Sequence, residues 1–152
     1  MAYHSLTIKL GGTLAKNTWD DWRLLPSSRP VVAPPEPVTN YVEVPGRNGA
    51  LDYSDLLGSI VYKNRTGSWD FIVVNEERSG YRPADWASRY QTIANFLHGK
   101  YVTVSLEDDS TYEYRGRVWI ASWNPGEHWS TVTLNYNFDP FKYVPGASTG
   151  VL

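Results

Sequence analysis

Alternating apolar and polar residues cover most of the chain and predict a β-rich domain. In SLTIKL the residues Leu6, Ile8 and Leu10 share one face, and in WSTVTLNYNFDP apolar residues recur at every second position. Side chains of a strand point alternately to its two faces, so each segment turns one apolar face toward a core. The apolar face of the second segment is formed by Val132, Leu134, Tyr136 and Phe138.

Further strands are expected between turn-forming residues. TWDDWRLL is a possible second strand, and SIVYKNR and SWDFIVVN are predicted as two strands that a turn around Thr66 and Gly67 joins. The stretch YVTVSLEDDSTYEYRGRVWIASW is predicted as a hairpin, because EDDS supplies turn formers between two alternating strands.

One segment has helical rather than strand periodicity. Pro83 suits the first position of a helix, and Asp85 suits the positive end of its dipole. The helix is expected to end at Gly99, because Gly is favoured just after a helix. Apolar residues spaced by three and four positions predict one buried stripe. They are Trp86, Tyr90, Ile93, Ala94 and Leu97.

A proline-rich stretch, PSSRPVVAPPEPV, follows the second expected strand. It contains five prolines from Pro26 to Pro37, which cannot donate to a sheet ladder and which favour extended backbone. A long, stiff surface loop in so small a domain usually has a function of its own. We therefore interpret this stretch as a functional loop or a contact arm.

These elements together predict a mostly β domain of the α+β class. Its sheet is β-sandwich-like or barrel-like, with one α-helix packed on it, a β-hairpin and a long Pro-rich loop. A chain of 152 residues with 41% hydrophobic content suffices for one core but not for two ordinary domains. We expect one domain over residues 1–143. Because VPGASTGVL is small and polar, we expect a flexible carboxy-terminal tail over residues 144–152.

Composition argues against several classes of function. The chain has no cysteine, which excludes disulfides, thiolate nucleophiles and cysteine zinc sites. It has no basic flank followed by a long apolar run, so we expect a product that is soluble and intracellular when made, with no membrane partner. The net charge is −2 and basic residues are not clustered, which argues against tight binding to nucleic acid.

The sequence contains few residues that are suited to catalysis. Its histidines are far apart, and His98, at the end of the expected helix, is explained by a favourable contact with the negative end of the dipole. Adjacent acids in the predicted hairpin turn lack the spacing of a calcium loop. We therefore expect no catalytic residue, no metal site and no cofactor. The residues weighed for these roles are His4, His98, His128, Glu107, Asp108 and Asp109.

The loop PGRNGA follows the expected strand YVEV and is the candidate site of the chain. Its glycines do not have the spacing of a phosphate-binding loop. One interpretation is a tight turn in which Gly46 or Gly49 adopts positive φ. The other is a corner of a contact between subunits, in which the planar donor fork of Arg47 crosses to a neighbour. The candidate interface or turn residues are Pro45, Gly46, Arg47, Asn48 and Gly49.

The order of these stretches resembles the amino-terminal domain of the distal tail proteins of long-tailed, siphovirus-type bacteriophages. The resemblance extends from about Leu6 to Tyr143. It rests on YVEVPGRNGALDYSD, YKNR, IANFLHGK, VTVSLEDDSTYEYRGRV and LNYNFDPFKY, in that order. Many members of that family continue into a second, carboxy-terminal β-sandwich, whereas the present sequence ends shortly after DPFKY.

The resemblance implies a structural, non-enzymatic component of the virion tail, assembled in the cytoplasm of the bacterial host. Such proteins form a hexameric ring at the end of the tail tube and a hub for the baseplate or tail tip. The implied partners are further copies of the chain, the tail-tube protein and tail-tip or baseplate hub proteins. DNA passes through the lumen without specific binding, and a near-neutral chain suits such a passage because it does not hold phosphates.

Two alternatives remain open at the level of sequence. Seven Trp and eleven Tyr are many for this length, and exposed aromatic rings in a groove stack on sugars. A carbohydrate-binding β-module is therefore one alternative, and the exposure of Trp69, Trp119 and Trp129 distinguishes it from core or interface packing. The other alternative is a tail-tube subunit, which shares the ring but stacks into long tubes.

Overall fold

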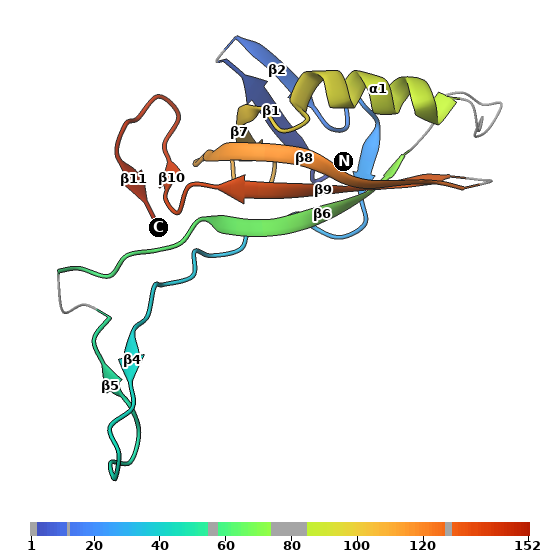
Figure 1. Ribbon diagram of the computed structural model, residues 1–152. Coiled ribbons are helices and arrows are strands. Elements are labelled where there is room, and N and C mark those ends of the chain that lie inside the picture. Colours follow the sequence, from blue (N-terminus) through green and yellow to red (C-terminus); the bar gives the residue numbers. More distant parts are fainter. Residues whose placement is uncertain (1–2, 12, 55–57, 74–84, 127–128) are drawn as a thin grey trace.

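The computed structural model describes residues 3–11, 13–54, 58–73, 85–126 and 129–152. Seven strands form one antiparallel sheet in the order β2-β1-β7-β8-β9-β6-β3, and one helix lies against it (Figure 1). The elements are β1 (Leu6–Leu10), β2 (Leu14–Asn17), β3 (Leu24–Pro26), β4 (Tyr41–Val42), β5 (Leu51–Asp52), β6 (Arg65–Val73), α1 (Asp85–Leu97), β7 (Tyr101–Leu106), β8 (Tyr114–Pro125), β9 (Ser130–Phe138), β10 (Lys142–Tyr143) and β11 (Gly150–Val151).

Strand β9 organises the sheet. It pairs with β6 on one side and with β8 on the other over its full length. Its buried positions alternate with half-buried ones, and the buried side chains Val132, Leu134, Tyr136 and Phe138 are those that the alternation predicts. The fold class is thereby confirmed: the domain is mostly β, with a large antiparallel sheet and one helix packed on it.

A row of aromatic rings fills the core along β6, β9 and β8. Trp69 stacks on Tyr136 with 4.5 Å between ring centroids, and Tyr136 stacks on Phe138 at 4.9 Å. Tyr114 continues the row at 5.8 Å from Phe138. Rings of this size bury large apolar areas and dominate the packing energy of a core. Burial also raises the pKa of the Tyr114 hydroxyl.

Helix α1 contributes the predicted apolar stripe to the core. Ile93 and Leu97 are fully buried, and Phe96 meets Trp22 edge to face with 5.5 Å between ring centroids. The helix ends at Leu97, whose carbonyl accepts a hydrogen bond from the N–H of Lys100 at 3.0 Å. The helix and its end before Gly99 are therefore confirmed. The parts of the prediction that lie outside the described structure are Pro83 and the side chains of Asp85 and Trp86.

The stretch TWDDWRLL is not one strand, so that expectation is wrong. Residues 18–23 form a helical turn in which the N–H of Arg23 donates to the carbonyl of Trp19 at 3.0 Å. The side-chain oxygen of Asn17 accepts hydrogen bonds from the N–H groups of Trp19 and Asp20, at 2.9 and 3.0 Å. Asn in this position is a favoured helix cap, so a local signal overrides the apolar spacing. Strand β3 begins only after this turn.

The turn expected at Thr66 and Gly67 is also wrong, because β6 runs straight through both residues. In the register of the sheet Gly67 lies opposite Tyr136, whose ring occupies the space that a side chain at position 67 would need. The Tyr136 hydroxyl then accepts a hydrogen bond from the N–H of Ala33 at 2.9 Å. Glycine is therefore present for close packing rather than for chain reversal.

The residues after β9 form a short hairpin. Lys142 and Tyr143 of β10 pair with Val151 and Gly150 of β11. The N–H of Tyr143 also donates to the carbonyl of Glu113 at 2.9 Å, which joins β10 to the residues before β8. The flexibility expected for residues 144–152, and a domain boundary at residue 143, stay predictions.

Candidate assembly site

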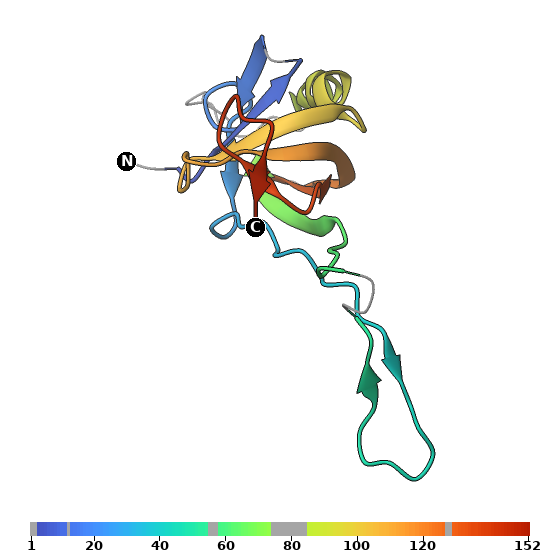
Figure 2. The ribbon, with the colours of Figure 1, turned by 90° about the vertical axis from the view of Figure 1, so that its left-hand side faces the viewer.

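The most prominent feature outside the sheet is an arm, which we define as residues 36–63. Its two limbs leave the body side by side and extend well beyond it, with β4 and β5 in the outer half (Figure 1, Figure 2). Every residue from 36 to 50 is exposed. The end of the proline-rich stretch, residues 36–38, and the loop PGRNGA, which lie apart in the sequence, are thus the start of the outgoing limb and the tip of one projection.

Prolines shape the root of the arm without breaking its pairing. Pro37 lies opposite Tyr62 in an isolated antiparallel bridge. The bonds that close this bridge come from its neighbours: Val38 N–H donates to the carbonyl of Val61, and Lys63 N–H donates to the carbonyl of Glu36, both at 2.8 Å. Proline lacks an N–H but is not required to donate here. The root is therefore both stiff and paired.

Hydrogen bonds around β4 and β5 hold the middle of the arm. Tyr53 N–H donates to the carbonyl of Asn40 at 2.7 Å, and Asn40 N–H donates to Ser54 Oγ at 2.9 Å. Asp52 Oδ1 in turn accepts from the hydroxyl and the N–H of Ser54. These hydrogen bonds lower the pKa of the exposed Asp52 carboxyl. The arm thus has a defined backbone although it has little core.

The tip contains all five candidate residues of PGRNG. Arg47 N–H donates to the carbonyl of Val44 at 3.2 Å across Pro45 and Gly46, and Gly46 has a φ of 80°. Pro followed by Gly at positive φ is the signature of a type II turn. Gly49 has a φ of 76°, so both glycines adopt the conformation that the turn interpretation expects. Within the described residues the Arg47 guanidinium has no hydrogen-bond or ion-pair partner.

Apolar side chains on the arm are left uncovered. Tyr41 is 59% exposed and Val61 is 62% exposed, although both are residue types that normally pack in sheets. An isolated two-stranded hairpin is at best marginally stable in water, so exposed apolar side chains on this arm make it a candidate interaction surface. The exposed large apolar residues of the described arm are Val38, Tyr41, Val42, Val44, Tyr53, Ile60 and Val61.

A pocket lies where the arm joins the body. The proline-rich limb, the first residue of β6 and the β10–β11 hairpin surround a space of about 420 Å³. Arg65 lines it and is only 5% exposed, with its Nε donating to the carbonyl of Pro140 at 3.0 Å and Nη1 donating to that of Ala33 at 3.2 Å. Burial lowers the pKa of this guanidinium.

From the sequence, Arg65 is predicted only as the end of the strand SIVYKNR, with no functional role. The alternation along the strand could have predicted its burial. Arg65 lies an even number of positions from the core residues Trp69, Phe71 and Val73 of β6, so all four share one face. The expected turn at residues 66 and 67 hid this alternation. Once β6 is continuous, Arg65 must face inward with the core residues.

The tryptophans do not form a sugar platform together. Trp69 is 4% exposed and donates from Nε1 to the carbonyl of Val31 at 2.9 Å, so it belongs to the core. Trp129 is 57% exposed, next to the β8–β9 turn. Trp119 is half-buried in a polar groove of about 220 Å³ that also contains Tyr101. The three residues thus occupy different environments.

The residues weighed for catalysis have structural contacts instead. His98 Nδ1 accepts a hydrogen bond from the N–H of Ile120 at 3.2 Å, beside the bulge in β8. Glu107 accepts bonds from the N–H and the hydroxyl of Ser5, at 2.8 and 2.9 Å, and these bonds lower the pKa of its carboxyl. His4 Nδ1 and Asp108 Oδ1 lie 2.7 Å apart, within hydrogen-bonding distance. His128 lies outside the described residues.

Among the described residues, no group of three or more His, Asp or Glu side chains is arranged to hold a metal ion. The described helix α1 is too short and too polar to cross a membrane.

Comparison with solved structures identifies a similar fold in the Dit protein (gp 19.1) of phage SPP1, described as a paradigm of the hub adsorption apparatus in phages that infect Gram-positive bacteria. The TM-score is 0.65 at 21% sequence identity, over 92% of this chain and 52% of the SPP1 protein. The chain thus spans about half the length of that protein. No family model and no curated protein sequence matches the chain. The resemblance to a phage distal tail protein is therefore confirmed at the level of the fold.

Proposed function

We propose that the chain is a structural, non-enzymatic subunit of a phage tail hub. In this proposal residues 1–143 are the ring-forming domain, and copies assemble into a closed hexameric ring between the tail tube and the baseplate or tail tip. The likeness to the SPP1 hub protein supports the proposal, because it covers 92% of this chain. The ring belongs to the virion tail and surrounds the passage for DNA.

The observation that carries the proposal is the exposed arm. Seven large apolar side chains on a projecting hairpin have no covering surface among the described residues of their own chain. Burying apolar area contributes about 25 cal/mol per Å², so a second copy that covers this face would stabilise both the arm and the contact. The arm of one copy is thus the natural contact with the next.

The shape of the molecule favours a ring over a simple pair. The arm leaves the body on one side (Figure 2), and in the proposal it meets a patch on the body of its neighbour rather than the neighbour's arm. Contacts between unlike patches generate rings when the rotation between neighbours closes, and open filaments when it does not. An arm-mediated contact of this kind gives the closed ring of the proposal if the rotation between neighbours closes after six copies.

The arm is tested by mass photometry of the full chain carrying Tyr41→Ser or Arg47→Ala. Tyr41→Ser removes apolar area from the contact and is expected to cost about 1.5 to 3 kcal/mol of assembly free energy. Arg47→Ala is expected to cost about 2 to 5 kcal/mol if its charge is paired and buried in the assembly. Each 1.4 kcal/mol appears as a tenfold rise in the dissociation concentration.

Leu14→Ser is the matched control, because Leu14 is 58% exposed at the start of β2 and far along the sheet from the arm. It is expected to leave assembly unchanged. Circular dichroism should show that all three variants remain folded. Assembly that is equally strong in both arm variants and in the control would contradict a role for the arm.

A further inference from the structure

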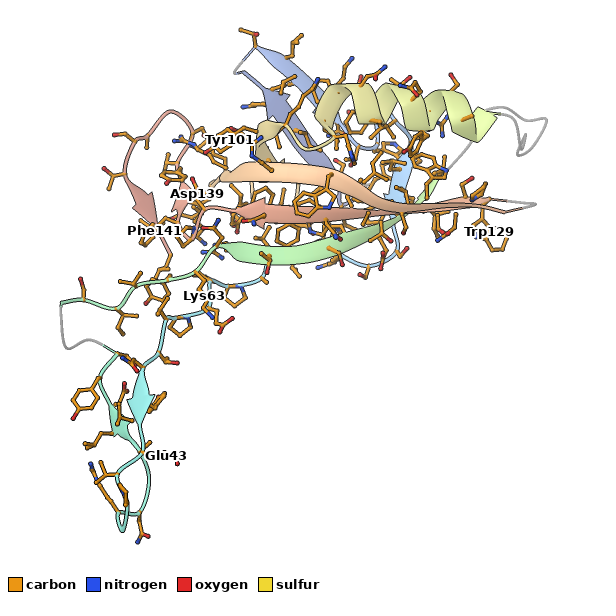
Figure 3. The ribbon with its side chains drawn as sticks, in the orientation of Figure 1. Glu43, Lys63, Tyr101, Trp129, Asp139 and Phe141 are labelled. Carbon is orange, nitrogen blue, oxygen red and sulfur yellow. The ribbon has the colours of Figure 1, made fainter. Side chains whose placement is uncertain are left out.

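In the described structure, the pocket at the root of the arm is lined by basic side chains and by no acidic ones. Its charged lining consists of Arg65 and Lys142, and no Asp or Glu is among the residues that line it. Its remaining walls are largely apolar and include Val32, Pro34, Pro35 and Leu152. Figure 3 labels Lys63, at the root of the arm, and Phe141, which directly precedes β10. The charged side chains that line the pocket are therefore all basic, and most of the other lining residues are apolar.

Arg65 uses only part of its hydrogen-bonding capacity. A guanidinium has five N–H donors in a planar fork, and the two bonds to the carbonyls of Pro140 and Ala33 come from Nε and Nη1. Nη2 has no hydrogen-bond partner among the described residues, and Arg65 forms no ion pair with a described carboxylate. The Tyr114 ring, 5.5 Å from the guanidinium carbon, covers one face. Burying a cation in this way costs free energy unless an anion lies close enough to pair with it.

The ammonium group of Lys142 also lacks an anionic partner among the described residues. It lies 4.5 Å from the centroid of the Tyr112 ring, and no described carboxylate pairs with it. Two cationic side chains beside one pocket favour an anionic group.

Among the described residues of the arm, one carboxylate is without a partner. Glu36 pairs with Lys63 at 3.0 Å, and Asp52 is hydrogen-bonded to Ser54, whereas Glu43 has no partner among the described residues. Glu43 lies between the exposed residues Val42 and Val44, so it combines a carboxylate with flanking apolar side chains. Figure 3 shows Glu43 in the outer part of the arm, well away from the body.

We propose that the pocket of Arg65 and Lys142 receives Glu43 from the arm of a second copy of the chain. The inference rests on the proposed ring and specifies its contact. Glu43 is too far along its own arm to enter its own pocket, so only a neighbour brings the charges together. The carboxylate completes the donor fork of Arg65 as a charge-assisted hydrogen bond.

A double-mutant cycle on the full chain tests this contact. Glu43→Gln is expected to raise the dissociation concentration of the assembly roughly tenfold or more, and Lys142→Gln severalfold, because close interfacial charge pairs couple strongly. The double variant should be no weaker than Glu43→Gln alone, since Lys142 then has no carboxylate to lose. Lys142 is chosen rather than Arg65, whose bonds to two carbonyls also support folding.

Glu36→Gln and Lys16→Gln are the matched controls, one on the arm and one on β2, and both should assemble like the unmodified chain. If the unmodified chain forms rings but Glu43→Gln assembles normally, or if the two losses simply add, the contact is wrong and the proposed ring stands. If the unmodified chain stays monomeric, the proposed function fails and the contact fails with it. If the unmodified chain retains duplex DNA, if Lys142→Gln abolishes that retention and if Glu43→Gln changes neither retention nor assembly, the pocket binds a phosphate. This proposal is then overturned.

Discussion

At the scale of single residues, a glycine and a tyrosine join the arm to the sheet. Gly67 leaves room for the buried ring of Tyr136, and the Tyr136 hydroxyl accepts the N–H of Ala33 just before the arm begins. The sequence presents Gly67 as a turn former, because a glycine between two apolar stretches fits either role. Only the pairing of Gly67 with Tyr136 across β6 and β9 identifies close packing as the reason.

Gly67→Ala should therefore lower the free energy of unfolding by about 1 to 3 kcal/mol, as overpacking in a core does. The added methyl group forces the Tyr136 ring out of its stack on Trp69 and away from Ala33. Ser68→Ala is the control, since Ser68 is the exposed neighbour on β6 and such changes stay within about 0.5 kcal/mol. Equal urea midpoints for the two variants would show that the ring adapts to the methyl group.

At the scale of elements, periodic segments were predictable and pairings over long distances were not. Strand β9 and helix α1 follow from alternation and from apolar spacing, which are local properties. The arm depends on pairing between residues 36–38 and 61–63, and its prolines mask the strand pattern of the outgoing limb. The role of Arg65 was missed for a related reason, because the break expected after it concealed that β6 is continuous.

Helix α1 allows a direct test of the predicted stripe. Leu97→Ala is expected to lower the free energy of unfolding by about 2 to 5 kcal/mol, because Leu97 is fully buried and its truncation leaves a cavity. Gln91→Ala, on the exposed face of the same helix, removes only an exposed hydrogen bond to Asn95 and should change stability by less than about 0.5 kcal/mol. Urea denaturation followed by tryptophan fluorescence measures both. A Leu97→Ala midpoint equal to that of Gln91→Ala would place the stripe outside the core.

At the scale of the whole molecule, the body and the arm differ in how far their apolar side chains are buried. The body buries its aromatic row in its own core, whereas the arm exposes apolar residues and the Glu43 carboxylate, which has no partner among the described residues. This difference is the one that the proposed assembly requires, because the arm would complete its contacts on a neighbouring copy. Carbohydrate binding, weighed from the aromatic content, receives less support, since Trp69, Trp119 and Trp129 occupy separate environments.

The most direct test of the proposed hub is the oligomeric state of the unmodified full chain, observed by negative-stain imaging together with mass photometry. The account predicts closed rings with six-fold symmetry and a mass of six chains, forming between roughly one and tens of micromolar, the range in which weak interfaces assemble. Long stacked tubes would indicate a tail-tube subunit instead. Monomers alone across the whole range would contradict the account.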